Sequence, residues 1–224
     1  MTNESSIKVP DAGTITAMQR QQKNRNRISV FLDDVFAFGV HQDVLLQHML
    51  YVGLRLEQPV IQEIQQADQL IRAKMSAISY LSYRARTEHE IRGKLRRDGF
   101  DESVRNTVIE RLHELSYIND ESFVLNYVRD RLNRKGHGPI RLKSDLRKLG
   151  ITKEQVDKAL SEVADANNIL DKALEQARKR IKRLQKETDP YKKRRKLQNF
   201  LLRKGHTLDT AREVVERLEQ EHPH

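Results

Sequence analysis

The sequence predicts a mostly α-helical protein: three tandem three-helix repeats form an elongated, curved helical body behind a small N-terminal β-hairpin/α domain. Leu, Ile and Val recur at intervals of three and four along most of the chain, and one glycine-containing pattern occurs three times. Hydrophobic residues make up 37% of the 224 residues and charged residues 33%, against about 45–50% and 25% in typical globular domains. The core is therefore expected to be spread along the chain.

The first 66 residues predict a flexible tail followed by a small mixed domain. Residues 1–13 are polar, as is common for loose termini. Residues 14–40 alternate between apolar and polar side chains, which indicates a β-hairpin with a third strand at Ile15–Gln19. A short helix over Gln42–Leu50 is expected to complete a domain of residues 14–66.

Three helical repeats are predicted to follow this domain. They occupy residues 67–116, 117–166 and 167–224. In each repeat a Leu lies four residues before a glycine, at Gly99, Gly150 and Gly205. Helices commonly end at a residue with positive φ, which glycine adopts without a Cβ clash. Each glycine is therefore expected to end the second helix of its repeat.

Capping residues mark where several of these helices begin. The pairs are Thr87 with Glu90, Thr152 with Gln155, Asp189 with Pro190 and Gly138 with Pro139. The first two are capping boxes, and the others place Pro at the first helical position. The first helices of the repeats are expected at about Ile71–Tyr83, Asp120–Arg134 and Asn168–Lys186.

Composition excludes several classes of protein. There is no Cys, hence no disulfide framework, thiolate nucleophile or Cys-ligated zinc. No apolar run reaches the roughly 18 residues that a membrane span needs, and the polar N-terminus lacks the apolar segment of a signal peptide. We expect a cytoplasmic protein without membrane association.

No catalytic motif is present, so we expect no enzyme, no cofactor and no metal site. Asp33 and Asp34 fit a two-residue turn better than a catalytic carboxylate pair. The segment Gly136–Gly138 fits a linker better than a phosphate-binding loop. The eight histidines are scattered and are expected at the surface.

The net charge of +10 suggests a polyanionic partner or an acidic protein surface. Eight candidate binding residues cluster around one helix junction of the second repeat: Arg129, Arg131, Arg134, Lys135, Arg141, Lys143, Arg147 and Lys148. Five more follow one another at a predicted helix start, where cations oppose the helix dipole: Lys192, Lys193, Arg194, Arg195 and Lys196. We assign this run to binding.

Two groups of residues have simpler interpretations that stay open. The basic pairs before the capping glycines also favour the dipole of a last helical turn. These pairs are Arg96-Arg97, Arg147-Lys148 and Arg203-Lys204. Four aromatic residues could stack on bases, but they share the apolar stripe and are expected in the core. They are Tyr80, Tyr83, Phe123 and Tyr127.

Several segments resemble one protein family. The segments with the strongest resemblance lie in the second repeat: Ile118–Phe123, Tyr127–Leu132, Gly136–Arg141 and Leu146–Ile151. They are similar to the central repeat of the RecX family of bacterial recombinase regulators. Tyr80–Thr87 and Gly99-Phe100 resemble its first repeat, and Ser29–Asp34 with Phe36–Phe38 its N-terminal hairpin. The resemblance covers about residues 14–218, although Ala85 stands where the family usually has Pro.

The resemblance implies a non-enzymatic regulator of the RecA recombinase in homologous recombination, DNA repair and the SOS response. Such a protein lodges in the groove of the RecA filament on single-stranded DNA. It limits filament growth, ATP hydrolysis, strand exchange and repressor co-cleavage. We expect a monomer that also binds single- and double-stranded DNA more weakly and in a salt-sensitive manner.

Two other functions fit the same sequence. One is a stand-alone, sequence-tolerant DNA-binding protein, because each helix–Gly–helix junction resembles a helix-turn-helix. The other is a helical-repeat adaptor for an acidic protein.

Overall fold

The computed structural model describes residues 10–163, 165–185 and 187–221, so most of the expected tail lies outside the described residues. The described residues form two compact units. The first comprises the described residues up to Tyr83 together with Lys94–Arg111, and we call it the N-terminal unit. The second comprises Arg84–Gly93 together with the described residues from Leu112 onward.

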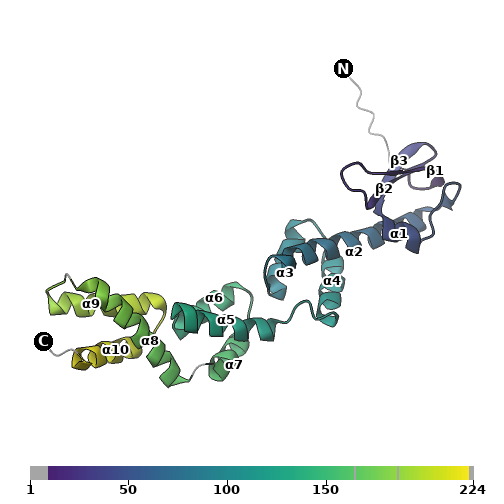
Figure 1. Cartoon of the computed structure of the whole chain (residues 1–224). Coiled ribbons are helices and arrows are strands. Elements are labelled where there is room, and N and C mark those ends of the chain that lie inside the picture. Colours follow the sequence, from purple (N-terminus) through teal and green to yellow (C-terminus); the bar gives the residue numbers. More distant parts are fainter. Residues whose placement is uncertain (1–9, 164, 186, 222–224) are drawn as a thin grey trace, which may run out of the picture. The chain divides into compact units, whose positions relative to one another are not determined.

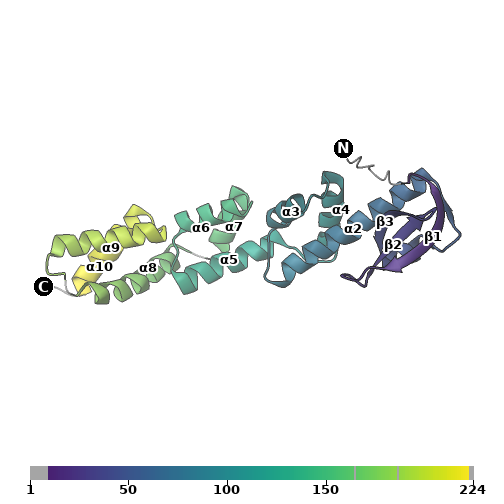
Figure 2. The ribbon, with the colours of Figure 1, turned by 90° about the horizontal axis from the view of Figure 1, so that it is seen from above.

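The N-terminal domain contains a four-stranded antiparallel sheet (Figure 2). Its strands are β1 (Gly13–Arg20), β2 (Arg27–Leu32), β3 (Val35–His41) and β4 (Arg55–Leu56), in the order β3-β2-β1-β4. Asp33 and Asp34 form the β2–β3 turn with φ of 46° and 63°, the conformation of a tight hairpin turn, which confirms the turn interpretation. The two-residue β4 was not predicted.

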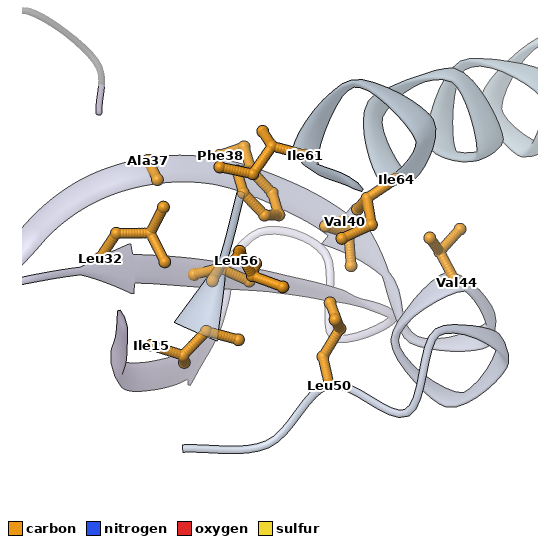
Figure 3. Packing of buried hydrophobic residues seen from close by; sticks show 11 residues of the cluster. Ile15, Leu32, Ala37, Phe38, Val40, Val44, Leu50, Leu56, Ile61 and Ile64 are labelled. Carbon is orange, nitrogen blue, oxygen red and sulfur yellow. The ribbon is translucent and has the colours of Figure 1, made fainter. Parts of the chain in front are cut away.

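The core of this domain lies between the sheet and helix α2 (Gln58–Ser82). Figure 3 shows Ile61 and Ile64 of α2 close to the strand residues Phe38 and Val40. The short helix α1 (Gln42–Gln47) adds Val44 to the same cluster. This burial of apolar surface is the main force that holds α2 on the sheet.

A buried ion pair fixes α2 further. Asp68 of α2 accepts two hydrogen bonds of 3.1 Å from the Arg27 guanidinium and one of 2.8 Å from the His41 backbone N–H. The helix continues without a break through Ser82, so it also supplies the first helix expected for repeat 1. The expected boundary between residues 66 and 67 falls inside it.

Helix α2 and the eight α-helices of the described residues after it form three three-helix repeats, which confirms the predicted mostly helical fold with three tandem repeats (Figure 1). After α2 come α3 (Glu88–Arg97), α4 (Glu102–Glu114), α5 (Asp120–Lys135), α6 (Pro139–Lys148), α7 (Lys153–Val163), α8 (Ala166–Ile181), α9 (Pro190–Lys204) and α10 (Leu208–Glu221). The helix expected over Asn168–Lys186 is α-helical only to Ile181 and continues as a 3-10 turn, Lys182–Leu184.

The predicted helix ends agree with the structure. Gly99, Gly150 and Gly205 have φ of 84°, 81° and 87°. In the capping box of α3, Thr87 Oγ1 accepts from the Glu90 N–H (3.2 Å), and the Glu90 carboxylate accepts from the Thr87 N–H (3.3 Å). The same reciprocal bonds join Thr152 and Gln155 before α7.

The second and third repeats each have their own apolar core. Val124 and Val128 of α5 pack with Leu146 of α6 and Leu160 of α7. The equivalent cluster in repeat 3 joins α8, α9 and α10. The aromatic residues expected in the core differ in their burial. The rings of Phe123 and Tyr127 stack with their centroids 6.0 Å apart and pack against the repeat 2 core, as expected. The core assignment of Tyr83 was wrong, because 82% of this residue is exposed.

Candidate nucleic-acid interface

Repeats 2 and 3 meet where the loop between α5 and α6 packs against the end of α9. The Gly138 N–H donates to the Lys204 carbonyl (2.9 Å), and the Ile140 N–H donates to the Gly205 carbonyl (3.0 Å). Helix α6 has no side-chain cap at Gly138. The carbonyls at the end of α9 therefore satisfy N–H groups at the start of α6, in a favourable arrangement of helix dipoles.

This contact requires glycine on both sides. A Cβ on Gly138 would overlap the backbone of Gly205, and a Cβ on Gly205 would overlap the backbone of Arg141. We call residues 136–138 and 204–206 the repeat 2–3 joint. The segment Gly136–Gly138 was expected to be a linker, but all three of its residues are buried in this joint.

A related contact links the start of α3 to the end of α6. Thr87 Oγ1 donates to the Leu149 carbonyl (2.7 Å), and a Cβ on Gly150 would collide with His89. Gly150 and Gly205 thus each end a helix and also contact the start of a helix of the preceding repeat, α3 and α6 respectively. These glycines serve both backbone conformation and close packing.

Two histidines of the joint are buried, which contradicts the expectation of surface histidines. His137 is 8% exposed and His206 is fully buried. His206 Nε2 lies 3.2 Å from the Gly136 carbonyl, and Nδ1 of each ring has no hydrogen-bond partner among the described residues. His41 is also buried, in the N-terminal domain.

The surroundings of these rings disfavour positive charge. Burial, followed by the charges of Arg141 and Lys204, lowers the pKa of His137 to about 4. Burial also lowers the pKa of His206, despite its bond to Gly136. Both imidazoles are therefore neutral near pH 7.

Several predicted cations gather around the joint. Lys204 Nζ donates to the Lys135 carbonyl (2.8 Å), and Arg141 Nη1 lies 3.5 Å from the Arg203 carbonyl. Burial and then the charges of Arg141 and Lys135 lower the pKa of Lys204. The structure thus brings Lys135 and Arg141 together with Lys204, a residue that was not among the candidate binding residues and for which a helix-dipole role had been left open.

The eight candidate residues of repeat 2 differ in their acidic partners. Arg131 and Arg134 lie 3.9 and 3.4 Å from Asp130. Arg141 lies 3.6 Å from Asp145, and Lys143 lies 2.7 Å from Asp157. The remaining four are exposed and have no acidic partner within the described part of the chain: Arg129, Lys135, Arg147 and Lys148.

The five cations at the start of α9 are partly neutralised by the protein itself. Lys192 lies 3.6 Å from Asp189, and Lys196 pairs with Glu187. Arg194 pairs with Glu219 (2.8 Å) and Glu216 (3.7 Å), both on α10. Lys193 and Arg195 have no ion pair with any described residue. The run is thus less available for binding than its sequence suggests.

Two further observations concern metal and membrane sites. Among residues 10–163, 165–185 and 187–221, no group of three or more His, Cys, Asp or Glu could hold a metal ion. Within those same ranges, no helix has the length and apolar character to cross a membrane.

Four family models match successive parts of the chain. They are the regulatory protein RecX N-terminal domain (residues 13–57) and the first, second and third three-helix domains of RecX (residues 73–112, 119–160 and 168–215).

Similar proteins cover nearly the whole chain. The regulatory protein RecX of Clostridium acetobutylicum is 30% identical over 93% of this chain and 97% of its own. The regulatory protein RecX of Clostridium perfringens strain 13 is 33% identical over 92% of this chain and 96% of its own. A crystal structure of regulatory protein RecX aligns with a TM-score of 0.68 and 28% identity over 92% of this chain and 99% of its own. The crystal structure of RecX from Lactobacillus salivarius aligns with a TM-score of 0.62 and 30% identity, over 69% of this chain and 99% of its own.

Proposed function

Because the chain belongs to the RecX family of regulatory proteins, we propose that it regulates the RecA recombinase by binding in the groove of the RecA–single-stranded DNA filament. It acts mainly as an inhibitor that limits filament growth, ATP hydrolysis, strand exchange and repressor co-cleavage. It works by binding rather than by catalysis, as a cytoplasmic monomer without a cofactor.

One structural observation supports binding to a polyanion. Repeat 2 carries four exposed cations without acidic partners in the described part of the chain: Arg129, Lys135, Arg147 and Lys148. Positive side chains that are not neutralised internally are the usual means of contacting DNA phosphates. By contrast, residues 1–66 carry 6 basic and 7 acidic residues. The repeats therefore supply the DNA-facing part of the protein.

The experiment that tests this function measures single-stranded-DNA-dependent ATP hydrolysis by RecA, with the protein present far below the number of DNA sites. A filament regulator inhibits under these conditions, because one bound molecule affects many RecA subunits. Inhibition only at amounts that saturate the DNA would contradict the proposal and favour a stand-alone DNA-binding protein.

A further inference from the structure

The repeat 2–3 joint has an excess of positive charge that nearby carboxylates do not neutralise. The basic residues around it are Arg131, Arg134, Lys135, Arg141, Arg203 and Lys204, and the carboxylates that pair with them are Asp130 and Asp145. The lowered pKa of Lys204 reflects burial and the like charges beside it. A bound anion would relieve this repulsion.

Helix dipoles explain only some of these cations. Lys135 and Lys204 lie in the last turns of α5 and α9, where a positive charge is favourable. Arg141 lies in the first turn of α6, where a positive charge opposes the helix dipole, and its acidic partner is Asp145, 3.6 Å away and one turn further along the helix. The dipole of α6 therefore does not account for a cation at this position.

The joint also holds these groups on a fixed frame. Backbone hydrogen bonds from Gly138 and Ile140 lock the start of α6 onto the end of α9. The backbone contacts at Gly138 and Gly205 leave no room for a Cβ. Arg141 and Lys204 are consequently positioned before any ligand arrives, which lowers the entropic cost of binding.

We propose that the repeat 2–3 joint is a binding site for a phosphate group of a nucleic-acid backbone, held by Arg141, Lys135 and Lys204. A guanidinium and two ammonium groups match the charge and the non-bridging oxygens of a phosphodiester. Buried Nδ1 of His137, which lacks a partner among the described residues, is a further polar group beside the site. The site rests on the proposed function and specifies where DNA is contacted.

The test follows the imidazole of His137 in the full chain by NMR, with a His137→Asn variant for assignment. Oligo-dT is expected to raise the pKa of His137 from about 4 by about one unit, because a nearby negative charge favours the imidazolium. An unchanged titration with saturating oligo-dT would overturn the site.

Two other probes separate the sources of negative charge. Pyrophosphate carries the same chemistry in a small ion, and polyglutamate represents an acidic protein. A His137 response to pyrophosphate and oligo-dT but not to polyglutamate supports the proposal. A response to pyrophosphate without one to oligo-dT, or an equal response to polyglutamate, would overturn it.

A single substitution gives an independent readout. The Lys135 side chain has no ion pair in the described residues, so Lys135→Gln should leave the joint folded. It should reduce the salt slope of oligo-dT binding by about 0.7, the value for one phosphate contact on a single strand. The matched control is Lys23→Gln, an exposed lysine of the N-terminal unit, which should keep the wild-type slope. Equal slopes in both variants would contradict the proposal.

The two proposals fail in different ways. Inhibition of RecA at low protein ratio without any His137 response would remove the phosphate site and leave the regulator. A His137 response to oligo-dT without inhibition of RecA would remove the regulator and leave the site.

Discussion

Gly99 and Gly150 have nearly the same backbone conformation but different neighbours. Both end a helix at φ above 80°. A Cβ on Gly99 would meet no atom within 4 Å, whereas a Cβ on Gly150 would collide with His89. The pair therefore separates the cost of a left-handed backbone from the cost of a close contact.

Gly99→Ala should lower the free energy of unfolding by about 1 kcal/mol, the cost of placing a Cβ residue at positive φ. Gly150→Ala should cost that amount plus about 1–3 kcal/mol for overpacking against His89. Urea denaturation followed by circular dichroism measures both. Equal losses would show that His89 moves aside freely, and that the contact between α3 and the end of α6 does not constrain Gly150.

The buried histidines of the joint predict a pH-dependent stability. His137 has a folded pKa of about 4, below the ordinary value of 6.5. As the pH falls below about 6.5 the unfolded chain takes up a proton that the folded chain refuses, so stability declines down to about pH 4. The decline is up to about 1.4 kcal/mol for each pH unit from this residue, and His206 acts in the same direction.

The measurement compares the free energy of unfolding at pH 7 and pH 5 for the wild type and His137→Asn. The variant should lose less stability between these two values. Glu88 and Glu90, whose pKa values are lowered from 4.5, act mainly below this window. An identical pH dependence in the two proteins would contradict the depressed pKa.

Sequence reasoning succeeded for the residues whose roles are local. A capping glycine or a capping box depends on neighbours within four positions, so its spacing is visible in the sequence. The burial of His137 depends on the end of α9, almost 70 residues away, and no local pattern encodes that contact. For the same reason Lys204 was not recognised as part of the cation cluster.

At the scale of elements, helix α9 begins with five cations that oppose its dipole. The sequence predicted a binding segment, and its role in binding stays a proposal. The structure adds carboxylates from outside the helix, above all Glu219 of α10, which lies 2.8 Å from Arg194. Glu216 and Glu219 lie about one turn apart on α10, some twenty residues after the five cations. Only the packing of α10 on α9 brings these two carboxylates next to Arg194.

The five cations should therefore contribute unequally to DNA binding. If only Lys193 and Arg195 neutralise phosphates, replacing both by Ser should reduce the salt slope on single-stranded DNA by about 1.4. Replacing Lys192, Arg194 and Lys196, which have acidic partners, should change the slope less. Fluorescence anisotropy at several salt concentrations measures both. A larger effect of the triple variant would show that DNA displaces the internal acids.

Helix α2 illustrates what periodicity does not reveal about elements. The sequence predicted the first helix of repeat 1 at about Ile71–Tyr83, whereas the structure has one helix over Gln58–Ser82. The same helix serves the sheet through Ile61 and Ile64 and then continues into repeat 1. The periodic spacing of apolar residues does not show at which residue a helix stops packing on one partner and begins to pack on another.

At the scale of the whole molecule, the chain separates a nearly neutral domain from basic repeats. Residues 167–224 carry 16 basic and 9 acidic residues, whereas residues 1–66 carry 6 and 7. The repeat architecture was predictable because its glycines recur at intervals of 51 and 55 residues. The contacts between repeats were not, because they join backbone groups that every sequence possesses.

The central proposal is that the unpaired cations of repeat 2 carry the regulation of the filament. Its direct test is the length of RecA filaments on single-stranded DNA, measured by electron microscopy at a low ratio of this protein to DNA sites. The test variant replaces four cations by Gln: Arg129, Lys135, Arg147 and Lys148. The control makes the same charge change in the N-terminal unit, at Arg20, Lys23, Arg25 and Lys74.

Wild-type protein and the control variant should shorten the filaments, because their polyanion-binding residues are intact. The test variant should leave the filaments long while keeping a wild-type circular-dichroism spectrum, since its four substituted side chains are exposed. Short filaments with the test variant, or long filaments with the control variant alone, would contradict the assignment of filament regulation to the cations of repeat 2.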